Sequence, residues 1–147
     1  MIRKASAVWN GSLKEGKGTI STDSKVLSNA QYSFSTRFEN GIGTNPEELI
    51  AAAHAGCFSM ALSAQLGGAG ITPESIETTA AVTLEKVEAG FTVTKIHLDV
   101  TAKIPGADPA AFEKAAQDAK AGCPISRLLK AEITMTTKLV GGRATSA

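Results

Sequence analysis

The feature that most constrains the fold of this chain is an uncharged run over residues 49–66. The run is long enough to be considered as a membrane span. However, it is built largely from Ala, Ser and Gly, it contains His54 and Gln65, and no Lys or Arg flanks it. A helix that is apolar on all sides is otherwise buried inside a domain. The run therefore predicts a central buried helix and no membrane association.

Capping signals mark both ends of this helix. Asn45 or Thr44 can act as the N-cap, and Pro46 suits the first helical position. Glycines from Gly67 onward end the apolar run. The predicted helix therefore extends from Pro46 to about Gln65.

Alternating apolar and polar residues predict strands on both sides of this helix. The predicted strands cover residues 5–9, 17–21, 31–38, 75–87, 91–104 and 133–140. Two further helices are expected, from Asp108-Pro109 to about Ala121 and over residues 125–129. This order of elements predicts an α+β fold with antiparallel sheets around the central helix.

Composition bounds the size, the partners and the location of the protein. A chain of 147 residues with 43% hydrophobic residues can bury one core without disulfides. We therefore expect a single domain over residues 1–140 and a disordered tail over residues 141–147. The formal net charge is +1 and the basic residues are scattered, so nucleic acid is not an expected partner. The first residues lack the pattern of a secretory signal, which predicts a cytoplasmic protein.

The two cysteines carry the reactive chemistry of the sequence. Cys123 stands between Gly122 and Pro124 at a predicted helix start, where unpaired backbone N–H groups favour a thiolate. Cys57 lies in the middle of the central helix, so its thiolate needs a positive charge from elsewhere. Arg37 is a candidate for that charge. From the residues alone, both cysteines could equally be inert packing residues.

Five segments follow the pattern of a known family in order and spacing: residues 36–39, 43–50, 53–63, 89–91 and 120–126. In these segments the sequence resembles the OsmC/Ohr family of organic hydroperoxide reductases, and most of all its osmotically inducible OsmC branch. The resemblance extends over about residues 3–140. It implies an OsmC-like intertwined homodimer with two active sites at the interface. It also implies a thiol-dependent peroxidase that acts on organic hydroperoxides in oxidative or osmotic stress.

The resemblance implies roles for four residues. Cys57 is the peroxidatic cysteine, which becomes a sulfenic acid, and Cys123 is the resolving cysteine, which forms a disulfide with it. Arg37 directs a positive charge to the peroxide, and Glu47 orients its guanidinium. No bound cofactor is implied; an external dithiol, borne by a lipoyl protein, regenerates the pair.

The substrate should contact apolar side chains next to these motifs. Phe38, Phe58, Met60 and Ile125 adjoin the motif residues, and we expect some of them to line a pocket for alkyl or aryl hydroperoxides. His54 is expected to be a packed polar residue. Two histidines and two distant cysteines give no zinc spacing, so no metal site is expected.

Two other classes of function remain open on the sequence. A thiol–disulfide oxidoreductase would use the same cysteines, although the sequence has no C-x-x-C motif. In a non-catalytic module that binds an apolar ligand, the two cysteines would serve only as packing residues. On the residues alone, Arg37 could be a surface residue of a strand, and Glu47 could merely favour the helix N-terminus.

Helix geometry adds an expectation about the subunits. Glu47 and Cys57 are ten residues apart on one predicted helix, which corresponds to about 15 Å of rise. A glutamate cannot span this distance. Either Arg37 bridges most of it, or the Arg37–Glu47 pair at each Cys57 belongs to the partner subunit. We favour the second arrangement, in which each active site is built from two chains.

Overall fold

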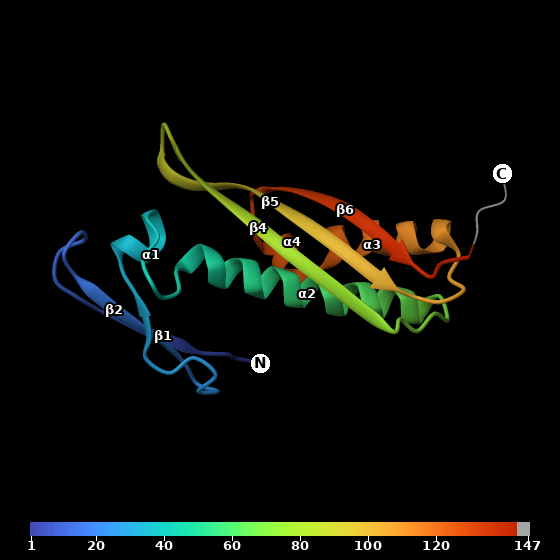
Figure 1. The fold of residues 1–147 in the computed structure, drawn as a ribbon, viewed down its shortest axis with the longest axis horizontal. Coiled ribbons are helices and arrows are strands. Elements are labelled where there is room, and N and C mark those ends of the chain that lie inside the picture. The colour runs from blue at the N-terminus through green and yellow to red at the C-terminus, as the bar shows by residue number, and fades with distance from the viewer. Residues whose placement is uncertain (144–147) are drawn as a thin grey trace. The chain divides into compact units, whose positions relative to one another are not determined.

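The chain begins with a three-stranded antiparallel sheet. The computed structural model describes residues 1–143 (Figure 1). The first sheet contains β1 (Ala5–Asn10), β2 (Lys17–Thr22) and β3 (Ala30–Tyr32), paired in that order. The strands predicted over residues 5–9 and 17–21 are confirmed. The strand predicted over residues 31–38 is confirmed only for Gln31 and Tyr32, because the chain then turns into the short helix α1 (Phe34–Phe38).

Helix α1 forms because Ser33 and Thr36 make a capping box. The Ser33 hydroxyl accepts from the Thr36 N–H, and the Thr36 hydroxyl accepts from the Ser33 N–H. Phe34 and Phe38 lie one helical turn apart, and their ring centroids are 4.9 Å from each other. Local capping therefore overrides the alternating pattern that predicted a strand here.

Helix α2 (Pro46–Gly68) is the predicted long helix, and it ends three residues later than the predicted Gln65. Its buried residues, His54, Phe58, Leu62 and Leu66, are four positions apart and form one stripe. The opposite face is exposed, so this chain buries the helix on one side rather than all round. By length and composition alone α2 could cross a membrane. Its buried stripe belongs to the core of a protein domain, so α2 is not a convincing membrane span.

The second sheet contains β4 (Ser75–Val87), β5 (Gly90–Lys103) and β6 (Glu132–Val140), with β5 in the middle. Strands β4 and β5, which confirm the strands predicted over residues 75–87 and 91–104, pair as an antiparallel hairpin. Strand β6 instead pairs with β5 in parallel, which corrects the prediction of purely antiparallel sheets. The reason is the connection between them: α3 (Pro109–Gly122) and α4 (Pro124–Leu128) return the chain to the start of β5. The α+β class itself is confirmed.

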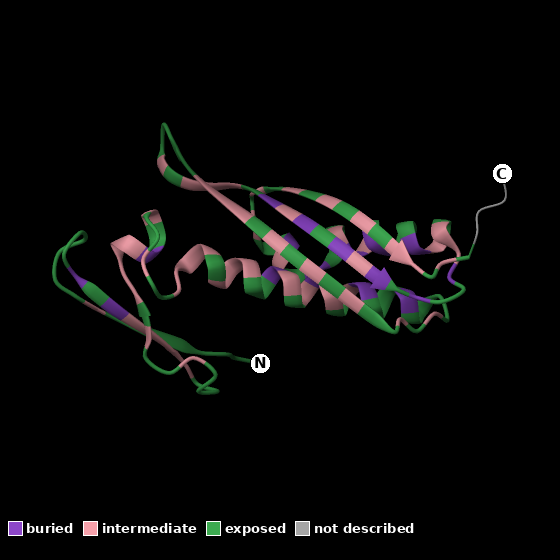
Figure 2. Cartoon of the chain, in the orientation of Figure 1, coloured by how far each residue is buried: buried purple, intermediate pink, exposed green. Residues whose placement is uncertain are grey.

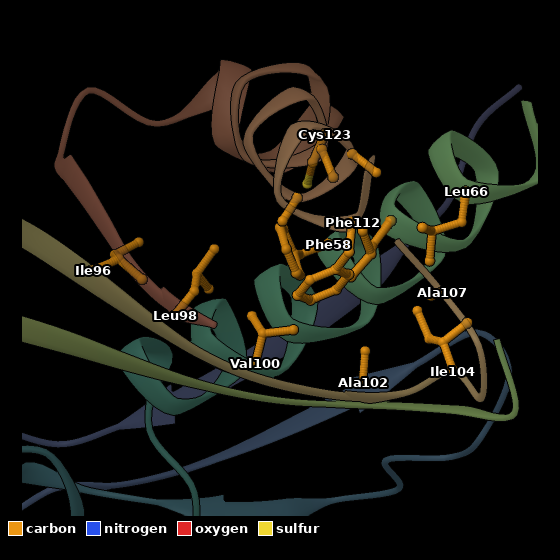
Figure 3. Close-up of a cluster of buried hydrophobic side chains, with 14 residues drawn as sticks. Phe58, Leu66, Ile96, Leu98, Val100, Ala102, Ile104, Ala107, Phe112 and Cys123 are labelled. Atoms are coloured by element: carbon orange, nitrogen blue, oxygen red, sulfur yellow. The ribbon is translucent and has the colours of Figure 1, made fainter. Parts of the chain in front are cut away.

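The hydrophobic core lies between the second sheet and its helices. Buried positions alternate along β5, as Figure 2 shows, and they include Ile96, Leu98 and Val100. Figure 3 shows these side chains facing Phe58 of α2 and Phe112 of α3. Helices α2 and α3 therefore cover the same face of this sheet.

The chain forms two compact units, Met1–Leu49 and a second unit from Ile50 onward. Among the described residues, every buried apolar side chain belongs to the second unit. The single domain expected over residues 1–140 stays a prediction. Of the tail expected over residues 141–147, Gly141 accepts from the Gly106 N–H at 2.8 Å, and the Arg143 N–H donates to Ala107 at 2.6 Å. Residues 144–147 lie outside the described part of the chain.

Candidate active site

Helices α2 and α4 bring the two cysteines together. The Sγ atoms of Cys57 and Cys123 are 2.7 Å apart, and both residues are free thiols. Cys57 is half-buried, whereas Cys123 is 0% exposed. Cys123 ends α3 and is the N-cap of α4, in which Pro124 is the first residue. The two sulfurs are therefore within reach of a disulfide bond.

The surroundings of Cys57 within this chain favour the thiol over the thiolate. Burial raises the pKa of the Cys57 thiol, and the contact with the Cys123 thiol raises it further. The backbone N–H of Ile125, which donates to the Cys57 sulfur, acts in the opposite direction without cancelling these effects. A nucleophilic thiolate at Cys57 therefore needs a further positive charge, as the sequence predicted.

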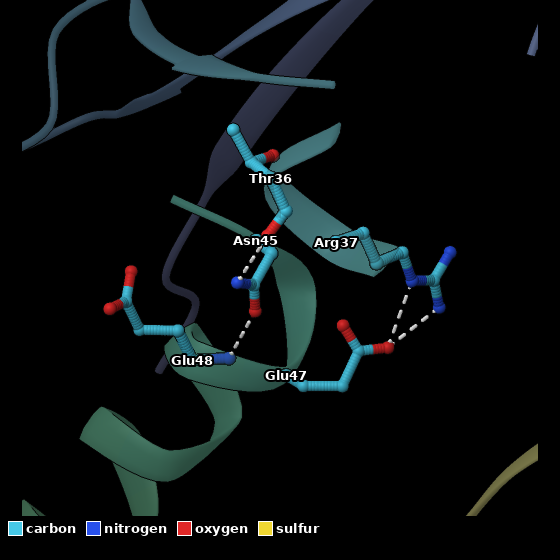
Figure 4. A network of polar contacts seen from close by, with 5 residues as sticks. All are labelled: Thr36, Arg37, Asn45, Glu47 and Glu48. Atoms are coloured by element: carbon cyan, nitrogen blue, oxygen red, sulfur yellow. Dashed lines mark hydrogen bonds and ion pairs between the residues drawn. The ribbon is translucent and has the colours of Figure 1, made fainter. Parts of the chain in front are cut away.

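Arg37 and Glu47 form an ion pair within the first unit (Figure 4). Both Nε and Nη2 of Arg37 donate to one carboxylate oxygen, Oε1 of Glu47, at 3.0 and 2.7 Å. Nη1 lies outside this ion pair, as Figure 4 shows. The Glu47 side chain is 12% exposed and that of Arg37 is 38% exposed. The carboxylate is therefore held below the surface while the guanidinium keeps one edge available.

Asn45 fixes the position of this ion pair. Its side-chain oxygen accepts from the Glu48 N–H at 2.7 Å and so caps α2. Of the two predicted N-cap candidates, Asn45 and Thr44, the structure therefore shows Asn45 in this role. Its side-chain nitrogen donates to the carbonyl of Thr36 in α1 at 2.9 Å (Figure 4). Asn45 therefore ties the helix that carries Arg37 to the helix start that carries Glu47.

A pocket of about 230 Å³ adjoins the Arg37 guanidinium. It is lined by Trp9, Leu13, Tyr32, Ser33, Phe34, Arg37, Phe38 and Pro46. The guanidinium carbon of Arg37 lies 5.3 Å from the centre of the Phe38 ring. The pocket thus combines aromatic walls with a single cation. Sequence reasoning missed Trp9 and Tyr32, which lie outside the motif segments. The spacing of Phe34 and Phe38 by one helical turn was an available signal.

The four residues predicted to contact the substrate occupy different environments. Phe38 lines the pocket beside Arg37. Phe58 is 0% exposed in the core, and Met60 on α2 is 76% exposed. Ile125 packs against the core, and its N–H donates to the Cys57 sulfur. Contact of these four residues with the substrate stays a prediction.

The two histidines are engaged in hydrogen bonds. His54 is 0% exposed, and its Nε2 lies 2.7 Å from the Ser126 hydroxyl, so the expected packed polar residue is confirmed. His97 contacts the hydroxyls of Thr134 and Thr136 on the neighbouring strand. Within residues 1–143, no three His, Cys, Asp or Glu side chains form a group that could hold a metal ion.

The fold and the paired thiols define an α+β protein with two free cysteines in contact. Residues 39–138 match the family model described as OsmC-like protein. The chain therefore belongs to the OsmC family, which confirms the resemblance seen in its motifs.

Two relatives mark the position of the chain in this family. It is 58% identical to peroxiredoxin OsmC of Escherichia coli strain K12 over 137 residues, and these aligned residues cover 93% of this chain and 96% of that protein. It is 30% identical over 100 residues to an organic hydroperoxide resistance protein of Xanthomonas axonopodis pv. citri, with 67% and 68% covered.

Solved structures agree with the fold. The organic hydroperoxide resistance protein OhrB of Bacillus subtilis superposes with a TM-score of 0.66 at 25% identity, covering 92% of this chain and 97% of that one. An OsmC-like protein from Mycoplasma pneumoniae superposes with a TM-score of 0.74 at 15% identity, covering 95% and 98%.

Proposed function

We propose that this chain is a thiol-dependent peroxidase that reduces organic hydroperoxides to alcohols and serves in the response to oxidative or osmotic stress. The observation that carries the proposal is the 2.7 Å approach of the half-buried Cys57 sulfur to the fully buried Cys123 sulfur. The relatives named as a peroxiredoxin and as organic hydroperoxide resistance proteins support hydroperoxides as the substrate class.

The reaction takes place in two covalent steps. The Cys57 thiolate attacks one peroxide oxygen, so that an S–O bond forms, the O–O bond breaks and the alkoxide takes a proton to leave as the alcohol. Sulfur is oxidised by two electrons to the sulfenic acid, and the peroxide is reduced. The Cys123 thiol then attacks that sulfur, which forms the disulfide and releases water. An external dithiol, for which we propose a lipoyl-bearing protein, reduces the disulfide.

Arg37 supplies the positive charge that the first step needs. A guanidinium near the thiolate favours its ionised form, and it also stabilises the negative charge that develops on the departing oxygen. Glu47 orients Arg37 by accepting from Nε and Nη2, which leaves Nη1 for the peroxide. This division of roles requires the guanidinium to reach Cys57.

We propose that the protein is a homodimer in which Arg37 and Glu47 of one chain serve Cys57 of the other. Along α2, Glu47 and Cys57 are separated by about 15 Å of helix rise, which a glutamate cannot span. Among the described residues 1–49 no apolar side chain is buried, although Val8, Leu13 and Ile42 are large and exposed. Burial against a second copy would give this unit the apolar contacts that a stable fold requires.

The organic part of the hydroperoxide is proposed to bind in the aromatic pocket beside Arg37. Its walls offer apolar contact to an alkyl or aryl group, and Arg37 stands where the peroxide group would lie. Phe38 lines this pocket and belongs to the same helix as Arg37. Hydrogen peroxide has no organic group, so contact with these walls adds nothing to its binding.

We also propose a cytoplasmic location for the protein. Thiols stay reduced in the cytoplasm, which suits this chemistry.

An assay of peroxide consumption tests the function. The reduced protein is mixed with cumene hydroperoxide or hydrogen peroxide, with a dithiol such as dihydrolipoamide present, and kcat/KM is measured for each. We expect a clearly higher kcat/KM for cumene hydroperoxide, and a Phe38→Ala variant should reduce this preference. Consumption of neither peroxide, together with reduction of insulin disulfides, would instead identify a thiol–disulfide oxidoreductase. Inactivity in both assays would leave a non-catalytic module that binds an apolar ligand as the remaining class of function.

A further inference from the structure

A buried polar contact joins the two helices that carry the cysteines. Nε2 of His54 on α2 lies 2.7 Å from the hydroxyl of Ser126 on α4. His54 is 0% exposed and Ser126 is 7% exposed, so water does not compete for this hydrogen bond. The peroxidase steps described above make no use of either side chain.

The spacing of these residues repeats the spacing of the thiols. His54 precedes Cys57 by three positions on α2, and Ser126 follows Cys123 by three positions at the start of α4. Side chains three positions apart on a helix lie on the same side of it. The His54–Ser126 contact and the Cys57–Cys123 contact are therefore two adjacent links between the same pair of segments.

Helix α4 needs such a link, because it has only five residues. A helix of this length has no stability of its own, so its position is determined by tertiary contacts. It nevertheless presents two groups to Cys57: the thiol of Cys123, its N-cap, and the N–H of Ile125. Ser126 directly follows Ile125 and comes three positions after Cys123, so the hydrogen bond to His54 acts within one helical turn of both groups.

The protonation state of His54 suits a structural donor better than a catalytic base. Nδ1 of His54 is buried and has no hydrogen-bond partner in the described structure. Burial also lowers the pKa of the His54 imidazole below its ordinary value of 6.5, so the ring is neutral at pH 7. An unpaired buried N–H is the costlier arrangement, which places the single proton on Nε2, where it is donated to Ser126.

We propose that His54 and Ser126 are positioning residues, which hold α4 so that Cys123 resolves the Cys57 sulfenic acid before a second peroxide oxidises it. The proposal rests on the peroxidase function for its biological meaning. The placement of Cys123 against Cys57 is a property of the fold, and it can be measured without any peroxide.

The first experiment therefore uses glutathione. The protein is equilibrated with mixtures of reduced and oxidised glutathione, quenched with N-ethylmaleimide, and the Cys57–Cys123 disulfide is measured by mass spectrometry. One oxidised glutathione is converted to two reduced molecules for each disulfide formed. We expect His54→Phe and Ser126→Ala to reduce the equilibrium constant for the disulfide about five- to tenfold, the effect of losing one buried hydrogen bond. His54→Gln keeps a donor near the position of Nε2 and should return most of the loss.

Ser59→Ala is the matched control. The Ser59 hydroxyl also lies on α2 and also makes a 2.7 Å hydrogen bond to another element, but that partner is Thr78 on β4. Within α2 the same hydroxyl donates to the Ala55 carbonyl at 2.8 Å. Its loss should lower the free energy of unfolding without changing the disulfide equilibrium. An equilibrium constant in Ser126→Ala and His54→Phe that matches the wild type, or a change in Ser59→Ala of equal size, would overturn the proposal.

The second experiment uses cumene hydroperoxide in excess. Each reduced variant is treated with increasing peroxide, and the ratio of disulfide to Cys57 sulfinic acid is measured by mass spectrometry. Weaker positioning should shift this ratio toward sulfinic acid about five- to tenfold in His54→Phe and Ser126→Ala. A ratio equal to that of Ser59→Ala would overturn the proposal. If the wild type does not react with the peroxide at all, the peroxidase function fails, and the glutathione equilibrium still decides the positioning role.

Discussion

At the scale of single residues, the different exposure of the two thiols separates their roles. Cys57 is half-buried and open to a substrate, whereas Cys123 is fully buried. We predict that Cys57→Ser abolishes turnover, because no other thiol can meet the peroxide. Cys123→Ser should consume about one equivalent of peroxide and then stall or proceed to sulfinic acid. Stopped-flow kinetics with intact-mass analysis measures both, and near-wild-type turnover in both variants would exclude the two-cysteine mechanism.

Arg37 should determine the pH at which Cys57 becomes reactive. Burial raises the pKa of Cys57, so within the single chain the thiolate is scarce near pH 7. We predict that Arg37→Met moves the midpoint of the pH–rate profile for peroxide attack upward and lowers the rate at pH 7 at least about tenfold, the effect of one pKa unit. Arg37→Lys keeps the charge and should move the midpoint less. A profile in Arg37→Met that overlays the wild type would assign the activation of Cys57 to another group.

His54 should make stability depend on pH. The pKa of His54 is lowered in the folded state, so below about pH 6.5 the unfolded chain takes up a proton that the folded protein resists. This contribution to stability is complete above pH 6.5 and is lost as the pH falls toward the folded-state pKa. The slope has an upper limit of about 1.4 kcal/mol per pH unit. Urea unfolding at pH 7.5 and 5.5 should show a smaller loss in His54→Gln than in the wild type; equal losses would contradict the prediction.

At the scale of elements, two helix caps can be compared. Asn45 caps α2 and also ties it to α1, whereas Asp108 caps α3 by accepting from the Ala111 N–H and pairs with the Arg143 guanidinium, far from Arg37 in the sequence. Each Ala substitution should cost about 1 kcal/mol in the free energy of unfolding. We predict that Asn45→Ala alone lowers kcat/KM as well, because Arg37 loses its fixed position. Urea unfolding and steady-state kinetics measure the two effects, and equal kcat/KM in both variants would reduce Asn45 to a simple cap.

Elements with strong local signals could be predicted from the sequence. Pro46 and Pro109, each after a capping residue, located the starts of α2 and α3 correctly, and alternation located strands β4 and β5. Helix α1 was missed because its capping box, Ser33 and Thr36, lies inside an alternating segment. The parallel pairing of β6 was also missed, because strand direction depends on the path of α3 and α4 rather than on any residue in β6.

The same distinction between local and long-range signals applies to the candidate site. Its motif residues could be predicted from the sequence, whereas its contacts between distant segments could not. The family motifs named Cys57, Cys123, Arg37 and Glu47, and the structure brings them together as two pairs. The aromatic pocket and the His54–Ser126 contact join segments far apart in the chain. The Phe34–Phe38 spacing is visible within one segment, but a single sequence does not show which distant segments meet.

At the scale of the whole molecule, the shared site predicts complementation between inactive subunits. An inactive Cys57→Ser protein is mixed with an inactive Arg37→Ala protein under conditions that allow subunit exchange, which native mass spectrometry verifies. One site of each mixed dimer then holds both Cys57 and Arg37, so statistical exchange should restore about a quarter of wild-type turnover. The control mixes two differently tagged Cys57→Ser preparations. No recovered turnover despite verified exchange would place each site within one chain.

The burial of Cys123 has a consequence for the order in which substrates meet the enzyme. A reducing thiolate must approach a disulfide along the S–S axis, and Cys123 is 0% exposed, so the donor can attack only the Cys57 sulfur. Peroxide and donor therefore occupy the same atom in turn, and neither can bind productively while the other is there. Such an enzyme follows ping-pong kinetics, with parallel lines in double-reciprocal plots when the donor concentration is varied.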